Sequence, residues 1–131
     1  DQLTVNAALS LIDATVVDDP AYRPRNQLEG NARRVGSLWV NWVKPRGTLR
    51  GLELGWGLFH RGRFFQTTAN DADTRVDAFT SMDAALGYTF GRVTTRLNVS
   101  NLTNEIGYLS ANRVYEPMWV RRAVLSVATT F

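Results

Sequence analysis

The sequence has 131 residues, of which 44% are hydrophobic and 21% charged, a composition that excludes an intrinsically disordered chain. The formal net charge is +3, but the arginines that supply it are spread along the chain, unlike the clustered basic patches of nucleic-acid-binding proteins. No cysteine is present, so disulfides and thiolate metal sites are excluded. The longest charge-free stretch, which includes Leu3 to Ile12, is shorter than the roughly 18 apolar residues of a spanning helix, a limit that does not apply to β-strands.

Alternation of apolar and polar residues predicts six β-strands, because a period of two is that of a half-buried strand. The expected strands cover residues 3–17, 34–44, 49–64, 76–90, 92–103 and 119–131. The third alternates most cleanly, with Leu54, Trp56 and Leu58 opposite Gly55 and Gly57. No segment repeats with a period of 3.6 over three turns. The sequence therefore predicts an all-β fold.

The connections between the expected strands alternate in length. Strands two and three are joined by "KPRGT", and strands four and five by little more than Gly91 and Arg92, whereas residues 18–33, 66–75 and 104–118 form long links. In an antiparallel up-and-down meander, successive links fall at opposite ends of the sheet, so this alternation sorts the short turns from the long loops. Outer-membrane β-barrels have the same asymmetry.

Strand length and aromatic residues agree with a barrel. About ten residues at roughly 3.3 Å each, tilted by about 45°, span roughly 25 Å, the height of a barrel's apolar band. In the last strand Trp119 and Phe131 share a face near opposite ends, where two aromatic girdles would fall. Trp42 and Phe90 lie at the short-turn end. We expect Phe131 to sit on the lipid side of the periplasmic interface.

The segment "LNVSNLTNEIGY", residues 97–108, resembles the late-strand motif of the TonB-dependent outer-membrane receptors, in the C-terminal part of the siderophore-receptor barrel. A loop and a final strand that ends on Phe131 follow it, as in that family. Earlier, "NARRVGSLWVNWV" and "LRGLELGWGLFHRGRF" resemble the family's strand entry and its following glycine-rich strand. The resemblance implies that residues 1–131 are the C-terminal part of a 22-stranded barrel, without the plug domain and the earlier strands. The first residue is Asp1 and not Met, so we expect the chain to begin inside a longer precursor.

The resemblance also implies a function. The chain would be part of an outer-membrane active-transport receptor that binds and imports a ferric siderophore or similar chelate with energy from the TonB complex, and it would not be an enzyme. No cofactor would be bound directly, and iron would enter only as part of the transported chelate. The other implied partners are the plug domain, outer-membrane lipid and lipopolysaccharide, and the barrel-assembly machinery.

Candidate functional residues fall into three sets. Expected on the lumen face, where charges avoid hydrocarbon, are Glu53, Arg61, Asp83, Arg96, Asn98 and Arg122. Loop candidates for binding an anionic, planar chelate are the aromatic and cationic residues Tyr22, Arg23, Arg25, Arg113 and Tyr115. Candidates for the lipid face and the assembly signal are Trp119, Leu125, Val127 and Phe131. We further expect Gly55 and Gly57 to leave room for close approach of backbone or plug.

Two alternatives remain at this stage. A soluble β-sandwich that binds carbohydrate would bury the apolar stripes in a closed core. An outer-membrane barrel hydrolase would need His60, the only histidine, near a serine and a carboxylate at the loop end.

Overall fold

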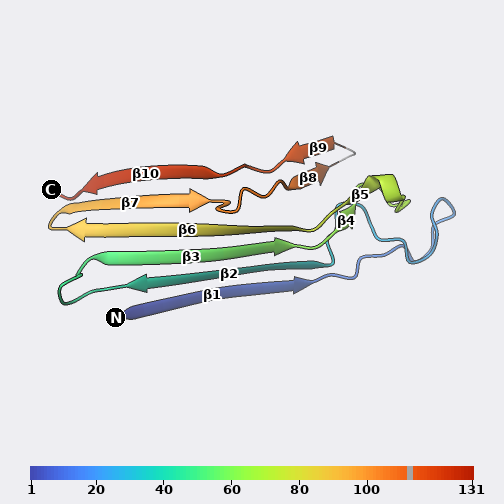
Figure 1. The fold of residues 1–131 in the computed structure, drawn as a ribbon. Coiled ribbons are helices and arrows are strands. Elements are labelled where there is room, and N and C mark those ends of the chain that lie inside the picture. Colours follow the sequence, from blue (N-terminus) through green and yellow to red (C-terminus); the bar gives the residue numbers. More distant parts are fainter. Residues whose placement is uncertain (112–113) are drawn as a thin grey trace.

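The computed structural model describes residues 1–111 and 114–131 (Figure 1). Its main feature is a six-stranded antiparallel sheet. The strands are β1 (Gln2–Leu11), β2 (Arg34–Val43), β3 (Leu52–Arg61), β6 (Phe79–Phe90), β7 (Val93–Ser100) and β10 (Arg122–Thr129). Among the described residues, no helix has both the length and the apolar character needed to cross a membrane.

The strand order is β1-β2-β3-β6-β7-β10, so every neighbour in the sheet is the next long strand in the chain. This confirms the predicted up-and-down meander. Figure 1 shows the β2–β3 and β6–β7 turns at the left end of the sheet, beside both termini, and the three long loops at the right end. We call these the short-turn end and the loop end.

The register sorts the side chains onto two faces. Asn6, Trp39, Gly57 and Asp83 form one row across four strands, because each is the pairing partner of the next. Paired residues point to the same side of a sheet, and residues alternate along each strand. The polar face accordingly carries Ser37, Trp39, Asn41, Glu53, Gly55, Gly57, Arg61, Asp83, Gly87, Arg96, Asn98, Arg122 and Ser126. The apolar face carries Leu3, Val5, Leu9, Leu38, Val40, Trp42, Leu54, Trp56, Leu58, Met82, Leu86, Leu97, Val99, Leu125 and Val127.

Glycine shapes the short-turn end. Gly47, Gly51 and Gly91 have positive φ values of 87°, 92° and 59°, a region that residues with a Cβ seldom adopt. Gly51 N–H donates to Lys44 O at 2.8 Å, and Gly51 O accepts from Thr89 N–H at 2.9 Å. The turn between β2 and β3 is therefore tied to β6 as well.

The loop end contains two small hairpins that the alternation did not predict. One pairs β4 (Phe64–Phe65) with β5 (Arg75–Val76), around a short 3-10 helix, η1 (Ala72–Thr74). The other pairs β8 (Tyr108–Ala111) with β9 (Val114–Pro117). Strands of two to four residues are too short to show a period.

Several predicted strands were too long at the loop end. β1 ends at Leu11 and not Val17, because Thr15 turns back to form an isolated bridge with Gln27. β7 ends at Ser100 because Asn101 has a φ of 51°. Apolar residues in the loops continued the alternation past the true strand ends.

The main cluster of buried hydrophobic residues lies at the loop end of the sheet. Ala32, Phe64 and Val76 are buried together, with Val35 packed against them. The long strands form a single layer, and most of their large apolar side chains are exposed. Within the described residues no second sheet covers either face, so the architecture is not that of a sandwich.

Candidate functional site

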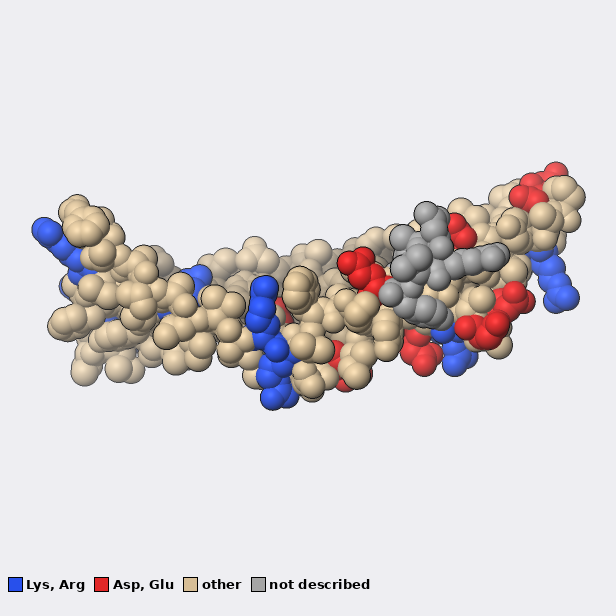
Figure 2. Space-filling view, turned by 90° about the horizontal axis from the view of Figure 1, so that it is seen from above, with Lys and Arg blue, Asp and Glu red and all other residues tan. Residues whose placement is uncertain are grey.

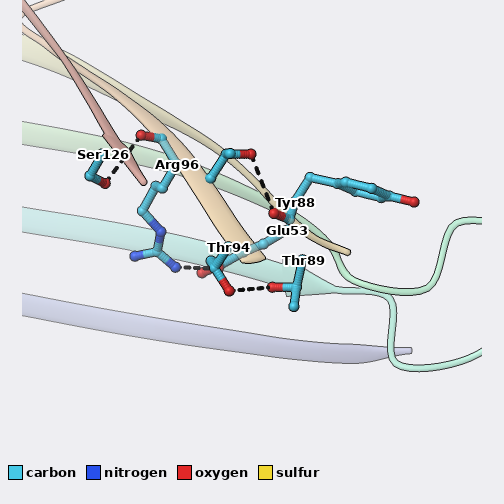
Figure 3. A network of polar contacts seen from close by, with 7 residues as sticks. Glu53, Tyr88, Thr89, Thr94, Arg96 and Ser126 are labelled. Atoms are coloured by element: carbon cyan, nitrogen blue, oxygen red, sulfur yellow. Dashed lines mark hydrogen bonds and ion pairs between the residues drawn. The ribbon is translucent and has the colours of Figure 1, made fainter. Parts of the chain in front are cut away.

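An ion pair crosses the polar face near the short-turn end. Glu53 on β3 and Arg96 on β7 flank Gly87 on β6, which is paired with both of them. Arg96 donates through Nη2 to Glu53 Oε2, and their side chains are 42% and 23% exposed (Figure 3). A Cβ on Gly87 would lie 3.2 Å from Glu53 Oε2, so glycine opens the passage for the two side chains. The pair thereby links strands that are not neighbours.

Hydroxyl groups near this pair form further hydrogen bonds between strands on the polar face. Ser126 Oγ of β10 donates to Arg96 O at 3.3 Å, and the hydroxyls of Thr89 and Thr94 lie 3.0 Å apart (Figure 3). The strands from β3 to β10 are thus joined by side-chain hydrogen bonds in addition to the backbone hydrogen bonds between neighbouring strands.

The indole of Trp39 packs against Gly55 and Gly57 of β3. A Cβ on Gly55 would come within 2.7 Å of Trp39 Cζ2, and one on Gly57 within 2.6 Å of Cε3. The two glycines do leave room, as expected, but a side chain of this chain already fills it. An aromatic residue on a polar face opposite a Gly-x-Gly strand is the sequence signal for this packing.

The family-like motif at residues 97–108 builds a hydrogen-bonded knot where β7 ends. Asn101, only 4% exposed, donates through its backbone N–H to Asp83 Oδ1 at 2.8 Å. Its Nδ2 donates to Glu105 O at 2.8 Å and to Trp119 O at 3.2 Å, and its Oδ1 accepts from Glu105 N–H at 3.0 Å. Asp83 shares a face with Glu53 and Arg96 by register, and its carboxylate is engaged in holding the turn. Asn98, one row away on β7, lies on the same face.

Two of the arginines expected on the lumen face, Arg61 and Arg122, contact aromatic rings. Arg61, at the loop end of β3, lies 4.5 Å from the centre of the Phe64 ring and donates through Nη2 to Tyr108 O. Arg122, at the start of β10, lies 5.6 Å from the centre of the Trp119 ring. Trp119 itself precedes β10 and is 79% exposed. Arg61 thus connects β3 to the β8–β9 hairpin.

The remaining lipid-face candidates are open to solvent. Leu125 and Val127 lie on the apolar face of β10, and Phe131 follows the strand. All three are exposed. They extend the apolar stripe to the short-turn end.

Of the loop candidates, two line a cleft. Tyr22 and Arg23 border a cavity of about 370 Å³ between the first and second loops, with Asp71 on its far side. Arg25, at a φ of 69°, donates its backbone N–H to Val16 O at 2.9 Å and is outside this lining. Arg113 and the side chain of Tyr115 lie outside the described residues.

Two asparagines join the loops that form this cleft. Asn26 Nδ2 donates to Thr68 O at 2.9 Å, and Asn70 Nδ2 donates to Gln27 O at 2.8 Å. Gln27 N–H in turn donates to Asn70 Oδ1 at 2.6 Å. The first and second loops are therefore one packed unit, which no pattern in the sequence predicted.

A second, cationic cavity of about 510 Å³ lies at the loop end of the apolar face. The side chains that line it include Arg33, Arg34, His60 and Arg63. Nδ1 of His60 is 2.8 Å from Thr80 Oγ1, and the lining contains no carboxylate. This cavity was not predicted, because its arginines come from two segments about 30 residues apart. In the view of Figure 2, the acidic side chains gather toward the loop end, whereas basic side chains appear at both ends and in the middle.

Comparisons with known proteins agree with this geometry. Residues 2–102 match the profile of the family described as "TonB dependent receptor-like, beta-barrel". The ferrichrome outer membrane transporter/phage receptor of Escherichia coli K12 is 26% identical over 136 residues, which cover 95% of this chain and 18% of that protein. The crystal structure of the siderophore receptor PiuA from Acinetobacter baumannii superposes with a TM-score of 0.76 at 22% identity, over 97% of this chain and 19% of that one.

The chain thus spans about a fifth of the length of these relatives. Its six-stranded meander matches part of a receptor barrel, and proteins of this family lie in the bacterial outer membrane and act as transporters, not enzymes. The hydrolase alternative is set aside accordingly, and His60 instead lies on the apolar face beside Thr80. The profile match covers most of the chain, and the chain belongs to the TonB-dependent receptor β-barrel family.

Proposed function

We propose that residues 1–131 form the C-terminal part of the barrel of a receptor that imports a ferric siderophore or similar chelate with energy from the TonB complex. The observation that carries this proposal is the separation of one polar face from one continuous apolar face, with the long loops packed at one end of the sheet. The relatives described as a ferrichrome transporter and a siderophore receptor support the class of ligand.

The polar face suits the lumen wall of such a barrel. Charges placed there avoid the hydrocarbon and can hydrogen-bond to water or to a plug domain. Glu53 and Arg96 neutralise each other, whereas the guanidinium of Arg122 stands 5.6 Å from an exposed indole near the loop end. We place contacts with the plug on this face, with Arg96, Asn98 and Arg122 as the candidate residues.

The loop cleft suits recognition of the chelate. Tyr22 offers a ring for stacking and Arg23 a positive charge, a combination that binds planar anionic groups. Because Asn26 and Asn70 fix the two loops to each other, the cleft is organised before the ligand arrives. A preorganised site spends less binding free energy on ordering loops.

The test uses the complete receptor that carries this segment. Tyr22→Ala combined with Arg23→Ala is expected to weaken binding of an anionic ferric catecholate siderophore by tenfold or more, which an equilibrium titration of tryptophan fluorescence would measure. Arg46→Ala combined with Arg50→Ala at the short-turn end is the matched control. If no member of a panel of ferric siderophores binds the unaltered receptor, the ligand class is wrong.

The C-terminal residues support a second, narrower proposal. The exposed apolar residues Leu125, Val127 and Phe131 face lipid and serve as the signal read by the barrel-assembly machinery. Phe131→Ala is expected to lower the amount of folded receptor in the outer membrane without changing siderophore affinity per folded molecule. An unchanged amount would remove the assembly role.

A further inference from the structure

We propose that Arg61 is the latch of the third loop. It docks the β8–β9 hairpin on the core of the loop end, and an anionic group that reaches the polar face there draws the guanidinium away from Tyr108 and frees the hairpin. The ferric chelate of the function proposed above is the source of that anion, and the inference rests on that function at this point alone. Arg61 lies on the polar face by register and ends β3, so it is at the loop end of the proposed lumen wall.

The contacts of Arg61 leave its positive charge without a counter-charge. Its Nη2 donates to the neutral carbonyl oxygen of Tyr108, and its Cζ lies 4.5 Å from the centre of the Phe64 ring. Nε is buried and has no hydrogen-bond partner among the described residues, and no carboxylate of these residues forms an ion pair with Arg61. A guanidinium binds carboxylates more strongly than neutral carbonyl groups. An incoming anion is therefore a better partner for Arg61 than Tyr108 is.

The hairpin that Arg61 holds has room to move. Phe64 belongs to the buried core, whereas Tyr108 begins β8 in the third loop. A cavity of about 270 Å³ lies between Asp77 of the second loop and Ile106 of the third. The hydrogen bond from Arg61 to Tyr108 is itself exposed, so an anion has access to it. The first and second loops are instead joined by the asparagine hydrogen bonds described above.

The base of the third loop stays in place when this hydrogen bond breaks. Gly107 packs directly on β6, because a Cβ there would lie 2.3 Å from Phe79 Cδ2. The carbonyl oxygen of Gly107 accepts from Met118 N–H at 2.9 Å and closes the base of the hairpin. Asn101 fixes the preceding turn. None of these contacts uses Arg61, so the unit that is released is the β8–β9 hairpin.

Hydrogen–deuterium exchange of the complete receptor in detergent micelles tests the docking, with mass spectrometry of peptides that carry β8 and β9. Arg61→Met keeps the length of the side chain but removes its charge and donors, so exchange in the hairpin is expected to rise about tenfold. Arg61→Lys keeps the charge and one donor group, and it should restore part of the protection. Arg63→Met, which removes an exposed arginine two residues away, is the matched control and should leave exchange unchanged. Heat-modifiable migration on gels verifies that each variant is folded.

Citrate tests the release, because its carboxylates stand in for an anionic chelate. Compared with chloride at the same ionic strength, citrate should raise exchange in the hairpin of the unaltered receptor severalfold and leave Arg61→Met unchanged. The proposal is overturned if the folded Arg61 variants exchange as slowly as the unaltered receptor, or if citrate and chloride act alike on it. Neither readout needs a siderophore, so a receptor that binds no ferric siderophore would reject the proposed ligand class without deciding the role of Arg61.

Discussion

At the short-turn end of the sheet the chain direction is set by glycine, whereas at the loop end it is set mainly by asparagine. Gly47, Gly51 and Gly91 adopt positive φ values, and Gly47 and Gly51 are held by hydrogen bonds between backbone groups. Asn70 and Asn101 adopt positive φ values at the other end, and their side chains bond to the backbone of other segments. One end turns the chain, while the other also ties loops together.

This difference gives the two ends of the sheet different structural roles. The glycine turns act through backbone groups, as in the hydrogen bond between Thr89 N–H and Gly51 O, whereas Asn26 joins two loops through its side chain, which donates to Thr68 O. Asparagine tolerates the left-handed region and brings both a donor and an acceptor. A loop built this way presents a fixed surface to a ligand, which a two-residue turn cannot do.

Removing the asparagine at the end of β7 tests the loop end most severely. Asn101→Ala loses three side-chain hydrogen bonds in a buried position, and we expect the free energy of unfolding to fall by about 3 kcal/mol. Guanidinium titration of the receptor in lipid vesicles measures this. Asn98→Ala, on the same strand, is the matched control and should change stability far less. Equal losses of unfolding free energy in the two variants would mean that the hydrogen bonds of Asn101 stabilise the protein no more than the side chain of Asn98 does.

Two glycines in one turn sharpen the comparison at the short-turn end. A Cβ on Gly51 would lie 2.3 Å from Thr89 O, whereas a Cβ on Gly47 would meet nothing within 4 Å. Gly47→Ala should therefore cost about 1 kcal/mol for its backbone conformation alone, and Gly51→Ala about 2 to 3 kcal/mol. The same titration gives both values. If the two variants lose equal stability, contact with β6 does not matter to this turn.

The middle of the sheet, between the two ends, depends on packing over glycine. Gly57→Ala places a Cβ 2.6 Å from the Trp39 ring, and we expect a loss of about 2 kcal/mol. Adding Trp39→Leu should recover part of that loss, because the smaller side chain frees the space. A double-mutant cycle with no coupling between the two positions would exclude the observed stacking.

The smallest effect is expected for the ion pair on the polar face. Glu53→Gln removes a partly exposed charge from Arg96, so the change in stability should stay near 0.5 kcal/mol and shrink further in high salt. Unfolding titrations at two salt concentrations measure it. A loss of several kcal/mol that resists salt would mean that the pair is sequestered in the assembled receptor.

The sheet could be predicted from sequence because alternation has a period that is visible within one strand. The order of strands, the sorting of turns and loops, and the face of Glu53, Asp83 and Arg96 all followed from it. The ends of the strands could not be predicted in this way. Residues such as Val16 and Leu102 continue the alternation of apolar and polar residues beyond β1 and β7, whereas contacts with other parts of the chain end these strands.

The candidate site was predictable only in part. Tyr22 and Arg23 stood out as aromatic and cationic loop residues, but the asparagines that position them bond to partners 42 and 43 residues away, which no local pattern records. The cationic cavity escaped notice for the same reason, since Arg34 and Arg63 are brought together by pairing of β2 with β3.

The meander has a consequence for how such a wall can diversify. Because each long strand pairs with the next one in the chain, inserting residues into a loop leaves every register in the sheet unchanged. Closing a loop of twice the length costs only about 0.6 kcal/mol more. The loops that we propose as the recognition surface can therefore change by insertion and deletion while the sheet keeps its registers.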